Sequence, residues 1–542
     1  MVPNGTIFSH VSQMIFMDNQ DINFYASVFC SIVTRFLLSI LTSTRKYEVG
    51  LIKILPYCIN VNKEHKIKLT TQTNNIFIKT LDNISQQNEL TRFFSCLNTE
   101  NIQLIYDLDE IDRFALEMFK IDKNDYDTVY QSVLDFEQLS EQYFEYEEVK
   151  NDYKRKSENR FQNITMYIIG VAFGRWDIRI ALDKSLIPQL PDPFDPLPVC
   201  SPGMLLSPDG YPAVSGQIVS EEWLRSRKNA LDVPLNIPEP VIADKDYPIA
   251  IRWDGILVDD EGHEADIVKH LRSVLSINYG ETADEREQEI LGTLSIKYLR
   301  DYFRQSKGFF QFHITRYSKS RRSAPIYWQL STPSSSYSVW LYYHRFTRDT
   351  FYKVLNDYVG PKLLHEERKL TSLHQDYGPN PTAGQRKEIA AQENFVEELR
   401  AFKQEVARVA PLWNPNFNDG VVINFAPLWR LVPQLKSWQK ECKSVWDKLA
   451  KGDYDWSRLA MHLWPERVVP KCLKDRSLAI AHKLEESLWY EAEDGKWRCR
   501  EVSKSEIDNL IKERTSPSVK AALNELLSAP VSSSRSRKER RK

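Results

Sequence analysis

Residues 326–343 read IYWQLSTPSSSYSVWLYY, and this stretch decides the local fold around it. Its two outer parts, Ile326 to Leu330 and Ser338 to Tyr343, are rich in β-branched and aromatic residues, which favour extended strands. The residues between them, Ser331 to Ser336, are the small polar residues and proline that are typical of turns. The stretch therefore predicts a β-hairpin.

The hairpin lies inside a longer segment, residues 302–348, whose charge is unusual. These 47 residues hold eight Lys or Arg and 13 aromatic residues but no Asp or Glu, although the whole chain of 542 residues has 74 acids. At that mean frequency about six or seven acids are expected. Lys and Arg neutralise phosphates, and aromatic faces stack on exposed bases, so a nucleic-acid partner would account for the missing acids. We call this segment the basic-aromatic strip.

The predicted hairpin separates the basic residues of the strip into two groups, one before its first strand and one after its second. Backbone phosphates of double-stranded DNA are the partner that we expect for them, as positioning contacts without sequence specificity. The candidate DNA-binding residues are Arg316, Lys319, Arg321 and Arg322 in the first group, His344, Arg345 and Arg348 in the second, Tyr327 and Trp328 in the hairpin, and Arg45 and Lys46 near the start of the chain.

An acidic segment offers a second interpretation of the strip. Residues 100–152 contain 16 acids and four bases, and Ile111, Phe114, Ala115 and Met118 recur at helical spacing. This pattern predicts an amphipathic connector helix with an acidic outer face. The strip's bases could pair with this segment while its aromatic residues form a core, and the chain would then be a protein-interaction scaffold.

The remaining patterns indicate a predominantly helical α+β chain of about three or four domains. Twelve prolines fall within residues 186–248, which predicts a long irregular segment. A spacing of 4, 3, 4 and 3 residues predicts a helix packed side-on against another helix. The residues with this spacing are Phe395, Leu399, Phe402, Val406 and Val409. The last ten residues hold six bases and are expected to form a disordered tail.

Compartment and membrane signals point to the cytoplasm. The seven cysteines are scattered and form no C-x-x-C pair, which is typical of reduced thiols. The apolar run Phe24 to Leu41 carries Ser31, Thr34 and Arg35 in its middle, so we expect a buried helix and no membrane contact. The first residues lack the basic stretch and cleavage site of a signal peptide.

A catalytic apparatus is missing from the sequence patterns. No two of the 18 glycines are two residues apart, so there is no G-x-G signature for adenosylmethionine or a nucleotide, and no Pro-Pro pair could form an adenine-binding Asn-Pro-Pro-aromatic loop. The carboxylates of Asp259 to Asp266 surround His263, and we interpret this stretch as a solvated acidic turn. We therefore predict no catalytic, cofactor-binding or metal-binding residue in this chain.

A series of short segments, in one order along the chain, resembles a known family. The segments are Phe173–Arg179, Leu190–Phe194, Trp253–His263, Arg316–Arg322, Ala324–Trp328, Leu341–Arg345, Asn356–Tyr358, Asn418–Val421 and Trp464–Arg467. Together they are similar to the C-terminal half of the adenine-specific DNA methyltransferases of BREX phage-defence systems (PglX-like) and of their type IIG restriction-modification relatives. The similarity extends from about residue 1 to about residue 500.

The resemblance implies modification of one adenine in an asymmetric DNA site, with S-adenosylmethionine as the methyl donor, to mark self DNA against phage. The family's methyltransferase domain has no matching positions here, so no catalytic or cofactor residue carries over. We expect a split or truncated product that holds DNA beside a separately encoded methyltransferase part or other defence-system subunits, or else a remnant of a truncated gene. The expected domains are 1–60, the end of a target-recognition domain; 61–160, the acidic helical connector; 161–370, a mixed α/β domain; 371–500, a helical region; and 501–542, a helix and basic tail.

Overall fold

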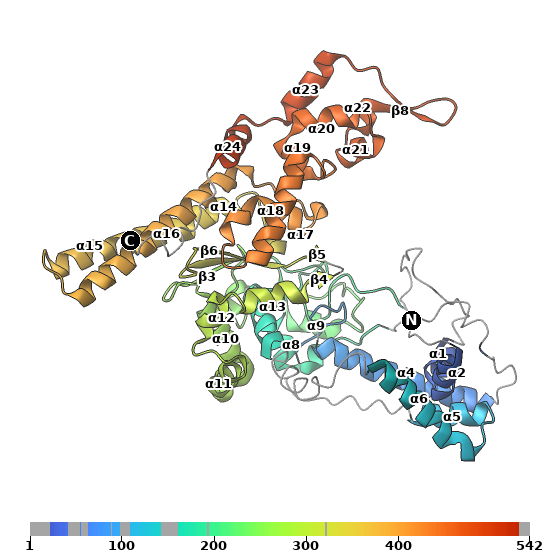
Figure 1. The fold of residues 1–542 in the computed structure, drawn as a ribbon. Helices are drawn as coiled ribbons and strands as arrows, with labels where there is room; N and C mark the ends of the chain where they lie inside the picture. The colour runs from blue at the N-terminus through green and yellow to red at the C-terminus, as the bar shows by residue number, and fades with distance from the viewer. Residues whose placement is uncertain are drawn as a thin grey trace. The chain divides into compact units, whose positions relative to one another are not determined.

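The computed structural model describes residues 22–41, 55, 63–87, 89–97, 109–141, 161–191, 195–319 and 322–529. Helices dominate it and its sheets are small and antiparallel, so the predicted helical α+β class is confirmed (Figure 1). The chain divides into two compact units, Met1–Pro248 and Ile249–Lys542. This boundary falls inside residues 161–370, which the sequence patterns group as one domain.

The first unit begins with five helices that share apolar faces. They are α1 (Ile22–Cys30), α2 (Ile32–Leu41), α4 (Lys63–Gln87), α5 (Asp109–Met118) and α6 (Tyr126–Glu141). Ile111, Phe114 and Ala115 of α5 are buried as the helical spacing predicts, Ala115 against α2 and α6, and Ile111 and Phe114 beside α1 and α4.

The apolar run predicted as one helix is two helices. The chain bends by 53° at a break between Asn23–Phe29 and Ile32–Leu41. The break has a cause in α5: the Asp112 carboxylate accepts from the backbone N–H of Ile32 at 2.6 Å, and so caps the start of α2. Among the described residues no single helix is long and apolar enough to cross a bilayer, and only this bent pair reaches that length and apolarity together.

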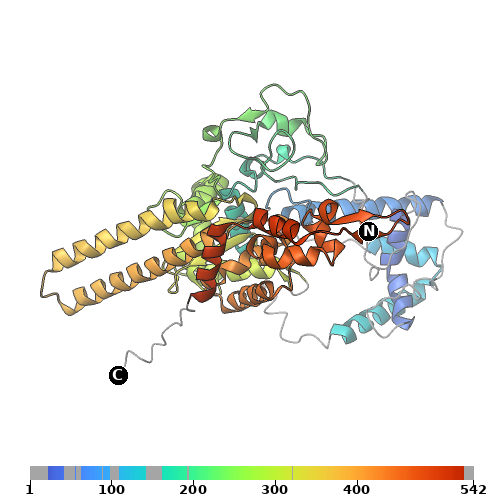
Figure 2. The ribbon, with the colours of Figure 1, turned by 90° about the horizontal axis from the view of Figure 1, so that it is seen from above.

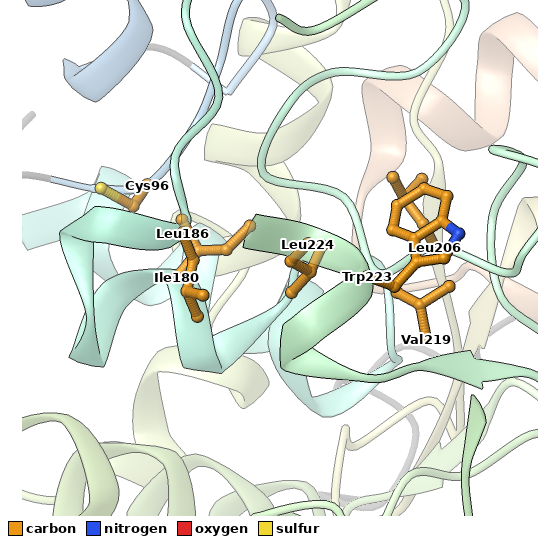
Figure 3. Packing of buried hydrophobic residues seen from close by; sticks show 7 residues of the cluster. All are labelled: Cys96, Ile180, Leu186, Leu206, Val219, Trp223 and Leu224. Carbon is orange, nitrogen blue, oxygen red and sulfur yellow. The ribbon is translucent and has the colours of Figure 1, made fainter. Parts of the chain in front are cut away.

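The proline-rich part of the first unit is largely irregular, as predicted, but it encloses its own core. The described elements here are an apolar helix (Phe161–Ala172), α8 (Ile178–Leu182), β1 (Ile218–Val219), α9 (Glu221–Ser226) and β2 (Val241–Ile242). Figure 3 shows the core, in which Trp223 and Leu224 of α9 lie with Leu206 and Val219 and with Cys96 from a distant segment. A buried ion pair between Arg179 and Asp177, 2.7 Å long, adds a polar anchor.

The second unit is built around a three-stranded antiparallel sheet of order β3-β7-β6. The strands are β3 (Ile256–Val258), β6 (Tyr327–Ser331) and β7 (Ser338–Tyr342). The pair β6–β7 confirms the predicted hairpin, and β3 is a partner that the sequence patterns missed. All residues of the three strands are buried, so the sheet is covered on both faces.

Helices surround this sheet. Between β3 and β6 lie α10 (Ile267–Tyr279), α11 (Ala283–Leu294), α12 (Leu299–Arg304) and α13 (Phe309–Arg316), followed by the short strands β4 (Ser318–Lys319) and β5 (Arg322–Ser323). After β7 come α14 (Thr350–Lys353) and a π-helical segment (Val354–Val359).

A long helical hairpin follows, formed by α15 (Gly360–Tyr377) and α16 (Ala383–Val409), which run side by side in Figures 1 and 2. The predicted side-on packing is confirmed. The buried seam contains Val396 where the sequence pattern has Phe395, which is only half-buried.

The C-terminal part is mostly helical but contains a further hairpin that the prediction of a helical region missed. Its helices are α17 (Val421–Phe425), α18 (Lys436–Lys451), α19 (Arg458–Leu463), α20 (Pro465–Cys472), α21 (Arg476–Ala481), α22 (Glu485–Leu488), α23 (Lys504–Arg514) and α24 (Pro517–Ser528). Strands β8 (Trp489–Glu491) and β9 (Trp497–Cys499) pair in antiparallel fashion. The predicted basic tail lies outside the described residues.

Candidate nucleic-acid interface

The register of the sheet brings separate basic segments to one end. In the antiparallel pair β6–β7, Tyr327 at the start of β6 faces Tyr342 at the end of β7. The N–H of Tyr343 donates to the carbonyl of Ile326 at 2.8 Å, and the N–H of Tyr342 donates to the carbonyl of Gly255, just before β3, at 2.9 Å. Residues before β6, after β7 and before β3 therefore meet.

We call this region the basic end of the sheet and define it by residues 252–255, 316–319, 322–323 and 343–348. It brings together described residues of both basic groups that the sequence patterns place outside the hairpin. It also adds residues 252–255, which the search for basic residues did not include. Three of these residues, Trp253 to Gly255, belong to the segment Trp253–His263, on which the family resemblance partly rests.

The segment before β6 folds back as a small hairpin, in which Ser318 pairs with Ser323 and Lys319 with Arg322. Ser320, Arg321 and the side chains of Lys319 and Arg322 lie outside the described residues, as do Arg45 and Lys46. Arg316 is half-buried at the end of α13.

A buried histidine holds this small hairpin against the sheet. Nε2 of His313 in α13 accepts from the backbone N–H groups of Ile326 and Tyr327, both at 3.0 Å. A nitrogen that accepts is unprotonated, so the neutral ring carries its proton on Nδ1. Since His313 is fully buried, these bonds fix the end of α13 to the start of β6.

Of the three candidate DNA-binding residues after β7, two are exposed and one is half-buried. His344 and Arg348 are exposed. The guanidinium of Arg345 lies over the indole ring of Trp253, 4.8 Å from its centroid, and burial lowers its pKa. Gly255 makes this stack possible: its φ is +69°, and a Cβ there would lie 2.6 Å from Cβ of Arg345.

Tyr327 and Trp328 need a correction. Both are completely buried, and Trp328 packs at ring-centroid distances of 4.3 Å from Phe425 and 4.7 Å from Phe346. A ring covered on both faces by protein offers none to a base, so these two residues are core residues and not surface contacts. The alternative interpretation, in which the strip's aromatic residues form a core, holds for these positions.

A polar cluster lies at the basic end, next to Trp253. The Tyr358 hydroxyl donates to the Asp254 carboxylate and accepts from Nη2 of Arg252 at 2.7 Å. Burial and the neighbouring carboxylate raise the pKa of Tyr358. Tyr358 belongs to the π-helical segment, a helix distortion often found at functional sites. Asp254, the one acid among residues 252–255, is therefore hydrogen-bonded within the protein.

The opposite end of the sheet is acidic, and its charges are paired within the unit. Asp259, fully buried, pairs with Arg300 and Arg304, and Asp266 pairs with Arg300 at 2.9 Å. The interpretation of residues 259–266 as a solvated turn is therefore wrong for these two carboxylates. Within the described ranges no group of three His, Cys, Asp or Glu residues could hold a metal ion.

Arg304 is a member of the basic-aromatic strip, and its pairing divides the strip. Nε of Arg304 donates to one Asp259 oxygen and Nη2 donates to the other at 3.2 Å. Arg304, the last residue of α12, thus lies at the acidic end of the sheet, while His344, Arg345 and Arg348 lie at the basic end. Arg304 is paired with a buried acid, and His344 and Arg348 are exposed.

Comparison with known proteins gives a distant similarity. The chain matches no protein-family model. It is 26% identical over 190 residues to the adenine-specific methyltransferase PglX of Lacticaseibacillus casei (strain Zhang). The match covers 32% of this chain and 15% of the relative, so the chain spans a small fraction of the curated relative's length. This similarity relates the chain to the adenine-specific methyltransferases.

Proposed function

We propose that this relative of the adenine-specific methyltransferases is the DNA-binding and recognition portion of a site-specific adenine N6 DNA methyltransferase of a phage-defence system, of the BREX or type IIG kind. In this proposal S-adenosylmethionine is the methyl donor of the reaction. The chain itself holds double-stranded DNA, in the cytoplasm.

The observation that carries the proposal is the pairing of Tyr327 with Tyr342. Tyr317 and Tyr343 are 26 residues apart along the chain. Because of this pairing, the basic segments that contain them lie at the same end of one sheet. Exposed Arg348 and His344 lie there, and Asp254 is paired with Arg252 at 3.5 Å. Exposed positive side chains attract a phosphate backbone.

The burial of the strip's large aromatic residues favours a duplex over a single strand. Binding of single strands uses exposed aromatic faces on which successive bases stack. Here Tyr327, Trp328, Tyr337 and Trp340 are all at most 1% exposed. The exposed basic side chains therefore remain as the contacts, and they suit the phosphate backbone on the outside of a duplex.

The test is duplex binding as a function of salt concentration. Each lost phosphate contact should lower the slope of log K against log[salt] by about 0.9, so changing Arg321 and Arg322 together to Ala should lower it by about 1 to 2. An unchanged slope would remove this pair from the interface. Salt-sensitive binding to a partner protein, with none to DNA, would instead favour the scaffold function.

A further inference from the structure

A helix outside the basic-aromatic strip continues its positive surface. Helix α18 contains five lysines and two acids in 16 residues, and its buried face is formed by Trp438, Cys442, Trp446 and Leu449. Both acids are engaged: Glu441 accepts from Ser323 at 3.1 Å, and Asp447 pairs with Lys443 at 2.7 Å. Among the described residues, no carboxylate pairs with the other four lysines, Lys436, Lys440, Lys448 and Lys451.

The direction of α18 follows from its contacts with the edge strand β6. Just before the helix, Gln434 bonds to Ser331 at 2.7 Å and to Gln329 at 3.2 Å, in the later part of the strand. Seven residues on, Glu441 contacts Ser323, which precedes the strand. Helix α18 therefore runs antiparallel to β6, and its C-terminal half points toward the basic end of the sheet.

Three exposed lysines of α18, one beside this contact and two beyond it, extend the basic end. Lys440, Lys448 and Lys451 are exposed and lie eight and three residues apart, which places them on one side of the helix. From Glu441 to Lys451 the helix advances about 15 Å, beyond the small hairpin β4–β5. Lys436 is exposed too, but it lies about 22 Å from Lys451, at the end of α18 near Gln434.

The C-terminal end of α18 is also held by cations. Arg467 donates to the carbonyls of Leu449 at 2.9 Å and Ala450 at 2.7 Å, the last turn of the helix. Buried Asp455 pairs with both Arg467 and Lys471, so one acid faces two cations there.

We propose that Lys440, Lys448 and Lys451 of α18 contact the backbone phosphates of the same DNA duplex that the basic end of the sheet binds. This inference rests on the proposed function and adds a second contact surface to it. Lysine ammonium groups that contact phosphates recognise charge and not base identity, so these contacts lengthen the bound duplex without reading sequence.

Duplex binding against salt tests the inference, with two triple variants of equal net charge. The first is Lys440→Gln, Lys448→Gln, Lys451→Gln. The control is Lys369→Gln, Arg386→Gln, Lys387→Gln, which removes three exposed basic side chains from the helical hairpin α15–α16. We expect the slope to fall by roughly 2 to 3 in the first variant and by less than about 0.5 in the control.

Further outcomes separate the two proposals. The same three positions changed to Arg should keep the wild-type slope, because the charge is kept. A wild-type slope in the first Gln variant, or an equal loss in the control, overturns the role of α18 and leaves the proposed function standing. Wild-type protein without salt-dependent duplex binding overturns the proposed function itself. Tighter binding to a single strand than to the duplex overturns the choice of duplex.

Discussion

His313 accepts a hydrogen bond from the backbone N–H of Tyr327, with 3.0 Å between Nε2 and the amide nitrogen. The same nitrogen accepts from Ile326, so one buried side chain satisfies two backbone donors at the start of β6. Through this contact the end of α13, which precedes the small hairpin β4–β5, is joined to the start of β6, which follows it. The candidate interface is thus tied to a residue that never reaches the surface.

Replacing His313 by Ala should strongly destabilise the second unit. The change leaves two buried N–H groups without their acceptor and opens a cavity, so we expect the free energy of unfolding to fall by about 3 to 5 kcal/mol. Urea denaturation measures this difference. His344→Ala is the matched control, because His344 is exposed, and it should change stability by less than about 0.5 kcal/mol. Equal effects of both changes would contradict the anchoring role.

The division of the basic-aromatic strip predicts different effects for its arginines. Arg348→Gln should lower the salt slope of duplex binding by about 0.9, since Arg348 is exposed at the basic end. Arg304→Gln should leave that slope unchanged and reduce stability, because Arg304 neutralises buried Asp259. Binding titrations at several salt concentrations, with thermal unfolding alongside, distinguish the two. A reduced slope for Arg304→Gln would mean that the acidic end of the sheet also touches DNA.

Arg467 should contribute more to stability than its neighbour Lys471. Both pair with buried Asp455, but Arg467 also caps the last carbonyls of α18 and is half as exposed, at 22% against 46%. We expect Arg467→Gln to lower the free energy of unfolding by about 2 to 4 kcal/mol and Lys471→Gln by about 1 kcal/mol or less. Chemical denaturation of the two variants tests this order, and a reversed order would refute it.

The titration of His462 should report on Arg348. Burial lowers the pKa of His462 from its usual 6.5, and the positive charge of Arg348 lowers it further. In the variant Arg348→Gln the pKa should therefore rise toward 6.5, which an NMR titration of the imidazole C–H signals would detect. An unchanged pKa would place Arg348 too far from His462 to interact.

Two buried histidines, His270 and His482, and the half-buried His462 together predict acid sensitivity of the second unit. Burial is the main cause that lowers the pKa values of His270, His462 and His482 in the folded protein. Below pH 6.5 the unfolded chain therefore binds more protons than the folded one, and stability falls as the pH drops toward the folded-state values. Urea denaturation at pH 7.5 and pH 5.5 should show this loss, and His462→Gln should reduce it.

Local sequence patterns were sufficient for elements whose contacts are short in range. The hairpin β6–β7 follows from strand-forming residues on both sides of a serine-rich turn, and α5 and α16 follow from helical spacing of apolar residues. The same patterns failed where a distant residue intervenes. Asp112 caps α2 and breaks the predicted single helix, and the predicted acidic turn is drawn into ion pairs by Arg300 and Arg304.

The sequence by itself determined that an acid-free, basic and aromatic segment surrounds a hairpin. Only the tertiary structure decided which of its residues face solvent. Trp328 enters the core because its apolar ring gains free energy by leaving water, and Arg304 turns to Asp259 because a buried carboxylate requires a counter-charge. Such partners lie far apart along the chain, 45 residues for Arg304 and Asp259 and 118 for Ser323 and Glu441, and no local pattern encodes them.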